Sequence, residues 1–456
     1  MGMRRITLWV ACMLTLNVTV VARAEMEAYQ GNWIIEYTDG SKALLEMSLD
    51  ESTFELASRR SVARKLLGLK YYAGRLLGMV PPRMITLRGT HYFRNDTLFL
   101  EGIYQSLTSR QDFGGTIVND TLRCTGANDM QLIGTRSSIT RPLRDYQHIV
   151  QAALDTTAHF LYDTRLLSHR RWRTFKKTVL QRSSKVVDDY EFEIMFNLPA
   201  RRLPFTHFGL MATAPIHDVA EAFASTPQDT GKFNIQRLDE NSVLFTVSTF
   251  VASAEEIASY IERLQQMSFE NLILDLRDNG GGTIASALPL ARYLAYDTLY
   301  GGFFLTQRYF QHHTELPDAK QSQALPLFNE ASFSLMLDGI HRESGLRLIV
   351  EPDSLPFRGN LYVLVNGATA STGEPLVYGL QRANLAVVIG EKTRGAMLNA
   401  EQFPLPGGYS AWIPTADYYA EDGYRLDQRG VRPDVRAKSA NCLEVTLKLI
   451  GERERR

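Results

Sequence analysis

The stretch LYVLVNGATASTGEPLVYGL, residues 361–380, most constrains the fold of this chain. Leu361 to Val365 is a short β-rich run that ends in turn residues, and apolar residues then recur at helical spacing. The members of that helical stripe are Leu376, Val377 and Leu380. Ser371 falls at the start of the predicted helix, where unpaired N–H groups and the helix dipole favour an anionic oxygen. Serine is also a preferred helix cap, so this turn alone leaves a nucleophile and a cap as alternatives.

An α/β core is predicted over residues 236–395, where strand and helix patterns alternate. The run VLFTVSTF predicts one strand, and NLILDL at 271–276 predicts a second, fully buried one. Apolar residues at helical spacing follow from about Ile284 to Leu294. This β-α-β order favours a core with largely parallel strand pairing.

The part of the chain before this core divides into a β-rich and a helical region. Residues 26 to about 140 contain short alternating segments separated by turn residues such as Asn119-Asp120, which predicts a small antiparallel β domain. From about Asp145 the pattern becomes helical. We interpret the basic run HRRWRTFKKTVLQR from His169 as the solvated face of an amphipathic helix, with binding of an anionic partner as the alternative.

The expected fold class is therefore multidomain α+β. The expected parts are a signal peptide at 1–24, a β-rich domain at 25–142, a helical segment at 143–235, an α/β core at 236–440 with an insertion at about 299–359, and a C-terminal tail at 441–456. For the insertion, the sequence leaves open whether it shapes a site or is a surface loop.

Composition and the N-terminus bear on the protein's environment. The chain has 50 basic and 50 acidic residues, and this balance gives no electrostatic reason to expect a nucleic-acid partner. Arg4 and Arg5, a following apolar stretch and the Ala22-Arg23-Ala24 site are typical of a secretory signal cleaved after Ala24, so we expect an exported, periplasmic or extracellular protein. No later run is long and apolar enough to span a bilayer. Whether the remaining cysteines, Cys124 and Cys442, form a disulfide is open.

A second informative stretch is LILDLRDNGGG, residues 272–282. Three glycines directly after a buried strand allow a tight turn with backbone N–H groups directed at a ligand, as an oxyanion hole requires. A flexible connection between strand and helix is the alternative.

Three motifs together, LILDLRDNGGG, VLVNGATASTGE and VVIGEKTRGA, resemble the serine peptidases of the C-terminal processing and tricorn core protease family. The resemblance is strongest from about residue 240 to 437 and does not cover the N-terminal β domain. It implies a crotonase-like β-α-β core with Ser371 as the nucleophile. It also implies an oxyanion hole formed by Gly281 and the backbone N–H of Thr372.

The general base differs between branches of that family. The lysine of the serine-lysine branch corresponds to Ala396 here, and Lys392 falls four residues too early. The tricorn-like branch instead uses a histidine after a small hydroxyl residue and a carboxylate before a GVxPD motif. Thr206-His207 and Asp427 in LDQRGVRPDV resemble these elements, although the family usually has glutamate at the second. The resemblance thus implies that His207 is the base and that Asp427 orients it directly or through Thr206.

Some further residues are candidates on position alone. Glu374, about one helical turn after Ser371, would contact the site or a substrate amine, or else favour the helix start. Arg394 is a candidate for binding a peptide carboxylate. About 65 residues separate His207 from the LILDL strand, which is too short for the PDZ domain that many relatives carry. No Cys/His cluster has zinc-ligand spacing, and no cofactor is implied.

The expected function is that of an exported serine peptidase acting on peptide or protein substrates. Two alternatives remain. One is a catalytically inactive ligand-binding protein on the same scaffold, as in the retinoid-binding relatives of this family. The other is a crotonase-type acyl-CoA enzyme, which also holds an oxyanion with backbone N–H groups from glycine turns but works inside cells.

Overall fold

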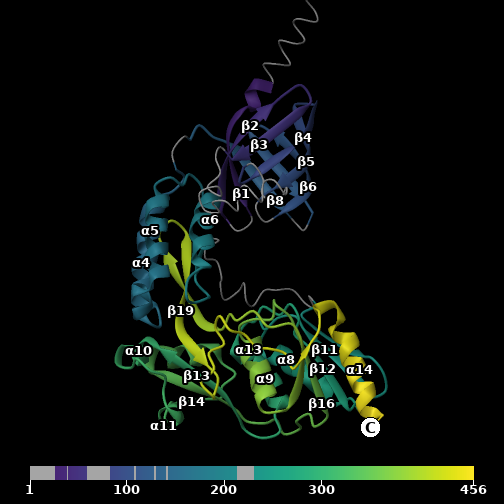
Figure 1. Ribbon diagram of the computed structural model, residues 1–456. Helices are drawn as coiled ribbons and strands as arrows, with labels where there is room; N and C mark the ends of the chain where they lie inside the picture. Colours follow the sequence, from purple (N-terminus) through teal and green to yellow (C-terminus); the bar gives the residue numbers. More distant parts are fainter. Residues whose placement is uncertain are drawn as a thin grey trace, which may run out of the picture.

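The computed structural model of the protein describes residues 26–37, 40–58, 83–106, 109–127, 130–139, 142–212 and 231–455 (Figure 1). It is a mixed α+β structure in which a barrel, a helical unit and an α/β core follow one another along the chain. The predicted signal peptide, residues 1–24, lies outside the described ranges. Within them, every helix is too short or too polar to cross a bilayer.

The N-terminal domain is an eight-stranded antiparallel barrel that β1 closes by pairing with β8. Its strands are β1 (Gly31–Tyr37), β2 (Lys42–Leu49), β3 (Thr53–Ser58), β4 (Thr86–Arg94), β5 (Thr97–Gln105), β6 (Arg110–Val118), β7 (Thr121–Gly126) and β8 (Gln131–Arg136). The Asn119-Asp120 turn joins β6 to β7 with φ angles of 48° and 59°, as a two-residue hairpin turn requires. The predicted antiparallel β domain is confirmed, and its closure into a barrel is an addition to that prediction.

A helical unit connects the barrel to the core. It contains α4 (Tyr146–Phe160), η1 (Thr164–Ser168), α5 (Arg170–Ser183) and α6 (Asp189–Ala200). Helix α5 buries Trp172, Phe175 and Val179 on one face, while most of its arginines and lysines are exposed. The basic run is thus the solvated face that the sequence predicts. Two strands, β9 (Gly209–Ala212) and β10 (Phe233–Arg237), also lie in the segment that we expected to be helical.

The core contains a six-stranded sheet in the order β10-β11-β12-β16-β17-β20, parallel throughout except for β10. Its other strands are β11 (Ser242–Val247), β12 (Asn271–Asp275), β16 (Asn360–Val365), β17 (Ala386–Gly390) and β20 (Val435–Arg436). Helices α8 (Ala254–Gln265), α9 (Ile284–Leu294) and α13 (Gly373–Arg382) contribute to the hydrophobic core on one face, and α14 (Cys442–Glu454) packs on the other. Burial on both faces explains the nearly continuous apolar runs in β12 and β16.

The segment 299–359 is part of the core, which differs from the insertion that we expected. It forms β13 (Leu299–Thr306), α10 (Gln307–His312), α11 (Ala319–Gln323), β14 (Leu327–Phe328), α12 (Phe333–Arg342) and β15 (Gly345–Val350). Together with β18 (Leu398–Leu405) and β19 (Tyr409–Tyr419) its strands make a second sheet in the order β14-β15-β13-β19-β18. Phe304 of β13 is buried in the same hydrophobic cluster as α9 and α13. The polar residues that suggested a loop lie between these buried strands.

The C-terminal segment, which we expected to be a tail, forms two helices. Residues 439–441 form the short helix η2, and α14 then covers the first sheet with Ile450 buried against it. Cys442 is buried at the start of α14, whereas Cys124 is buried in the barrel, and both are free thiols. The disulfide that the sequence left open is therefore absent between these two cysteines.

Two buried carboxylates at the start of α6 attach the barrel to the helical unit. Asp189 accepts hydrogen bonds from the Lys42 backbone N–H (2.9 Å), from Tyr146 Oη (2.8 Å) and from the Arg144 guanidinium (2.8 and 3.0 Å). Asp188 accepts from the Leu44 backbone N–H at 3.0 Å. Since Lys42 and Leu44 belong to β2, the first turn of α6 is bound directly to the barrel wall.

We expect Asp189→Ala to lower the free energy of unfolding by about 2–3 kcal/mol, because it removes an ionised acceptor from several buried donors. Chemical denaturation followed by circular dichroism measures this. A suitable control is Asp338→Ala, which removes an exposed i,i+4 pair with Arg342 and should change stability by less than about 0.5 kcal/mol. Equal effects of the two substitutions would contradict a special role for Asp189.

Candidate active site

Two turns that are distant in sequence meet at one edge of the first sheet. Strands β12 and β16 are parallel neighbours, with Asp275 opposite Leu364, so the glycine turn after β12 and the serine turn after β16 emerge side by side. Buried Asn279 ties them together: its backbone oxygen accepts from the Ala370 N–H at 2.9 Å, and its side chain donates to Val247 O at 2.8 Å. The sheet topology thereby positions the two sequence motifs as one site.

Ser371 has an unusual backbone conformation in this turn. Its φ of 53° lies in the left-handed region, and its N–H donates to Ala396 O at 2.8 Å. The N-cap of α13 is Thr372, whose hydroxyl donates to Gly282 O at 2.8 Å instead of capping the helix. Among the described residues, no hydrogen-bond partner is seen for the Ser371 hydroxyl. Ser371 is therefore not the cap of α13, which was one of the two alternatives from the sequence.

The glycine turn lies directly against Ser371. A Cβ on Gly281 would come within 2.4 Å of Ser371 Cβ, and the φ of 99° also disfavours any side chain there. The Gly281 N–H donates to Asn279 Oδ1 at 2.8 Å, so this predicted oxyanion donor is already engaged in the structure. The Thr372 N–H, the second predicted donor, has no acceptor among the described residues.

His207 lies in the turn between α6 and β9, and Thr206 beside it makes two contacts. Thr206 Oγ1 is 2.9 Å from His207 Nδ1, and the same hydroxyl donates a short hydrogen bond to Asp427 Oδ1. Because β9 pairs with β19, this turn is held against the second sheet. The structure thus brings together the three residues of the predicted base element, with the hydroxyl in the middle.

Burial sets the electrostatics of the two titratable groups in this element. It lowers the pKa of the half-buried His207 to about 4, with the nearby Arg394 guanidinium acting in the same direction. It raises the pKa of Asp427, which is 1% exposed, to about 7. Arg425 opposes this rise, since its Nη2 lies 3.2 Å from Asp427 Oδ2, and Arg425 also pairs with buried Asp417 at 2.8 Å.

The loop at residues 393–396 connects the serine turn to the base element. Glu374 is fully buried and accepts from Thr393 Oγ1 (2.6 Å) and from the N–H groups of Gly395 (2.7 Å) and Ala396 (2.8 Å). Both of its oxygens are therefore occupied by the loop, which does not fit the substrate contact considered from the sequence. Gln428, next to Asp427, donates its N–H to Gly395 O at 2.7 Å, so one network spans both halves of the site.

Sequence reasoning missed several residues that hold this arrangement. Gln428 also donates through its side chain to Leu203 O at 2.9 Å, which fastens the histidine turn. Asn279 stands directly before the glycines, and Arg425 stands two residues before Asp427. These residues could have been suspected because they stand next to the motifs in the sequence. Their hydrogen bonds, however, depend on how the loops fold, which the sequence does not show. In the described part of the chain, no group of three or more His, Cys, Asp or Glu residues is arranged to hold a metal ion.

A family model described as Peptidase family S41 matches residues 241–437. The chain contains a peptidase family S41 domain. Ser371, Gly281 and Asp427 lie inside the S41 domain, whereas Thr206 and His207 precede it.

Relatives of known name support the assignment of the S41 domain. A carboxyl-terminal-processing protease of Picosynechococcus sp. is 26% identical over 190 residues, which cover 41% of this chain and 37% of the relative. A chloroplastic C-terminal processing peptidase of Tetradesmus obliquus is 26% identical over 174 residues, which cover 38% of this chain and 30% of the relative. The similarity thus spans about a third of the length of these curated proteins.

Solved structures are similar to this chain more weakly. A lipoprotein from Streptococcus agalactiae aligns with 70% of this chain and 100% of its own, with a TM-score of 0.44 and 18% identity. The tricorn protease aligns with 92% of this chain and 47% of its own, with a TM-score of 0.39 and 11% identity. Both TM-scores are below 0.5, so neither structure defines the arrangement of the S41 domain and its neighbours.

The raised pKa of Asp427 predicts how stability depends on pH. The unfolded carboxyl ionises near 3.8 and the folded one near 7, so between these values the folded state holds a proton that the unfolded state has released. The stability of the wild type relative to Asp427→Asn should therefore fall as the pH rises from about 4 to 7, by at most about 1.4 kcal/mol per pH unit.

Urea denaturation of both proteins across this pH range measures that difference. The difference between the wild type and Asp427→Asn has to be used because His207 also titrates in this range. The pKa of His207 is lowered from 6.5 to about 4, so His207 makes both proteins more stable as the pH rises between those values. The contribution of His207 cancels in the difference as long as the substitution leaves it unchanged. A difference that stays flat from pH 4 to 7 would contradict the raised pKa of Asp427.

Proposed function

We propose that this protein is a serine peptidase that hydrolyses peptide bonds of peptide or protein substrates after export, with Ser371 as nucleophile and His207 as general base. The observation that carries the proposal is the Thr206 hydroxyl, which contacts His207 Nδ1 at 2.9 Å and donates to Asp427. Such an arrangement orients a neutral imidazole for proton transfer.

The direction of these hydrogen bonds supports His207 as the base. When Asp427 is ionised, above its pKa of about 7, the one proton of the Thr206 hydroxyl goes to Asp427, so Thr206 Oγ1 accepts from the protonated Nδ1 of His207. The lone pair of the neutral imidazole then lies on Nε2. His207 remains neutral at physiological pH because burial lowers its pKa to about 4.

The proposed reaction follows from these roles. His207 Nε2 takes the proton of Ser371 as the serine oxygen attacks the peptide carbonyl, and the resulting imidazolium protonates the departing amine. Water, deprotonated by the same imidazole, then attacks the acyl-enzyme, and the imidazolium returns its proton to the departing Ser371 oxygen as the acid product is released. No hydrogen bond joins Ser371 Oγ to His207 among the described contacts, so substrate binding has to bring these groups within reach, as in many unliganded sites.

An oxyanion hole is supported at the start of α13. The Thr372 N–H has no acceptor among the described residues, and it lies at the positive end of the helix dipole. The Gly281 N–H would be the second donor if it shared its hydrogen with Asn279 Oδ1 and the oxyanion. The removal of a single such donor typically lowers kcat by about 10²- to 10³-fold.

The two alternatives make different chemical predictions. An inactive binding protein on this scaffold would leave Ser371 unreactive. An acyl-CoA enzyme would act through backbone N–H groups alone, and its turnover would survive Ser371→Ala. The left-handed backbone of Ser371, its partner-free hydroxyl among the described residues and the base element all favour the peptidase.

We expect a fluorophosphonate probe to label the wild-type protein on Ser371 and to leave Ser371→Ala unlabelled, because only an activated serine attacks phosphorus at neutral pH. Cleavage of casein or of a fluorogenic peptide mixture should fall by about 10⁴-fold or more in the variant. His159→Ala serves as a control, since His159 lies in the last turn of α4 and belongs to neither half of the site. Absence of labelling in the folded wild type would favour the binding protein.

A substitution of Thr206 tests whether its hydroxyl connects His207 to Asp427 in the active enzyme. Thr206→Val keeps the shape but removes the hydroxyl, so kcat/KM should fall by about 10²- to 10⁴-fold. Thr206→Ser restores the hydroxyl and should recover activity to within about tenfold of the wild type. If valine and serine variants were equally active, His207 would not depend on Asp427 through Thr206.

A further inference from the structure

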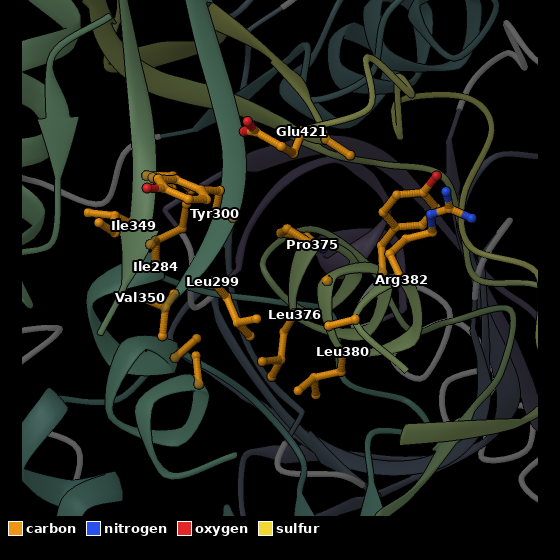
Figure 2. Close-up of a pocket in the computed structure, with 18 of the residues that line it drawn as sticks. Ile284, Leu299, Tyr300, Ile349, Val350, Pro375, Leu376, Leu380, Arg382 and Glu421 are labelled. Carbon is orange, nitrogen blue, oxygen red and sulfur yellow. The ribbon is translucent and has the colours of Figure 1, made fainter. Parts of the chain in front are cut away.

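A cavity of about 470 Å³ lies between α9, α13 and the second sheet. Helix α13 and its two caps line one side of the cavity, at positions i, i+3, i+4, i+6, i+7, i+8, i+10 and i+11 counted from Thr372 to Ala383, so about half of the helix circumference faces the space. The lining residues of α9 repeat the pattern at Ile284, Ala287, Leu288 and Ala291. Figure 2 shows Leu376 and Leu380 projecting from α13 on one side of the space, with Ile284 and Val350 on the other.

Small residues keep this space open. Gly379 on α13 and its C-cap Ala383, with Ala287 and Ala291 on α9, occupy positions where larger side chains would narrow the gap. A Cβ added to Gly379 would meet no atom within 4 Å, so the protein itself leaves this part of the wall unfilled. The volume is within the usual range of ligand sites and exceeds the gaps of ordinary core packing.

One end of the cavity lies beside the proposed nucleophile turn. Thr372 is part of its wall, and this residue directly follows Ser371 and supplies the proposed oxyanion donor. Pro375 continues the wall one turn further along α13. An acyl group held at Ser371 is therefore next to one end of the cavity, and a side chain on that acyl group is the nearest candidate to enter it.

The charges at the rim favour an uncharged occupant. Asp422 accepts from Tyr378 Oη at 2.9 Å and pairs with Arg382 at 3.3 Å. Glu421 pairs with Arg347, whose guanidinium also lies 4.0 Å from the centre of the Tyr300 ring. Each acidic group of the rim thus has a cationic partner, while the walls between α9 and α13 are apolar.

We propose that this cavity receives a large apolar side chain of the peptide substrate, at the residue whose carbonyl is attacked by Ser371. The inference rests on the proposed peptidase function and names its substrate class: peptides with a leucine-like or aromatic residue at that position. Burial of such a side chain is expected to strengthen binding by about 10- to 100-fold over a polar one.

Two fluorescein-labelled heptapeptides test this, both composed of alanine except for the central residue, which is leucine in one and asparagine in the other. Binding is measured by fluorescence anisotropy in the Ser371→Ala background, so the test does not need turnover. The leucine peptide should bind about tenfold tighter or better. In Ser371→Ala with Gly379→Leu the added side chain takes up part of the cavity, and the preference for the leucine peptide should fall to about threefold or less.

The matched control is Gly451→Leu in the same background. Gly451 also lies inside a helix, α14, and it is remote from the cavity lining, so the preference for leucine should remain. Circular dichroism of each variant checks folding. Equal binding of the two peptides before any cavity change, or a preference that Gly379→Leu leaves intact, would overturn the proposal.

Two further outcomes separate this inference from the proposed function. Leucine-selective binding that Gly379→Leu weakens, in a protein whose Ser371 neither reacts nor cleaves, would refute the peptidase but keep the cavity assignment as a peptide site. Cleavage of both peptides at equal rates would keep the peptidase and refute the cavity assignment. Tight binding of palmitate that Gly379→Leu weakens, without any peptide preference, would assign the cavity to a lipid instead.

Discussion

The arrangement of this site depends on a single hydroxyl proton. Thr206 stands between an imidazole and a carboxylate, and its one proton is directed to Asp427. Nδ1 of His207 therefore has to be the protonated nitrogen, which leaves Nε2 as the basic one. A protonated Asp427 would offer its own proton to the same hydroxyl, and the relay would then run in the opposite direction. Burial raises the pKa of Asp427 to about 7 and Arg425 beside it opposes that rise, so the salt bridge widens the pH range in which the carboxylate, and with it this tautomer of His207, is present.

The sequence predicted the structure best where the residues of the site also determine the local backbone conformation. The glycine turn and the Ser371 turn were predicted correctly as strand-to-helix connections, and the parallel pairing of β12 and β16 then brings them together without further assumptions. The boundaries of α9 could be predicted for a similar reason, since its apolar residues repeat strictly at helical spacing. Thr206, His207 and Asp427 were recognised only by resemblance. Asp427 follows Thr206 by 221 residues, so no local sequence pattern links the carboxylate to the adjacent pair Thr206 and His207.

Other features were not accessible from the sequence because they depend on the contacts of folded loops. Glu374 has the spacing of a site residue, yet three donors from the 393–396 loop surround it, and its buried carboxyl has a raised pKa that those hydrogen bonds oppose. Likewise, segment 299–359 has the composition of a loop on average, although its buried residues are concentrated in β13 and β15, which pair within the second sheet. Average polarity conceals short buried strands when the connections between them are long and charged.

The attachment of the barrel has a structural consequence for the proposed base. Helix α6 spans 12 residues, or about 18 Å. Its first turn is bonded to β2 of the barrel through Asp188 and Asp189, and the turn that carries His207 begins a few residues after its last turn. The helix therefore connects the barrel wall to the turn that carries the proposed base. Only the residues between Ala200 and His207 separate the imidazole from hydrogen-bonded helix that is attached to the barrel.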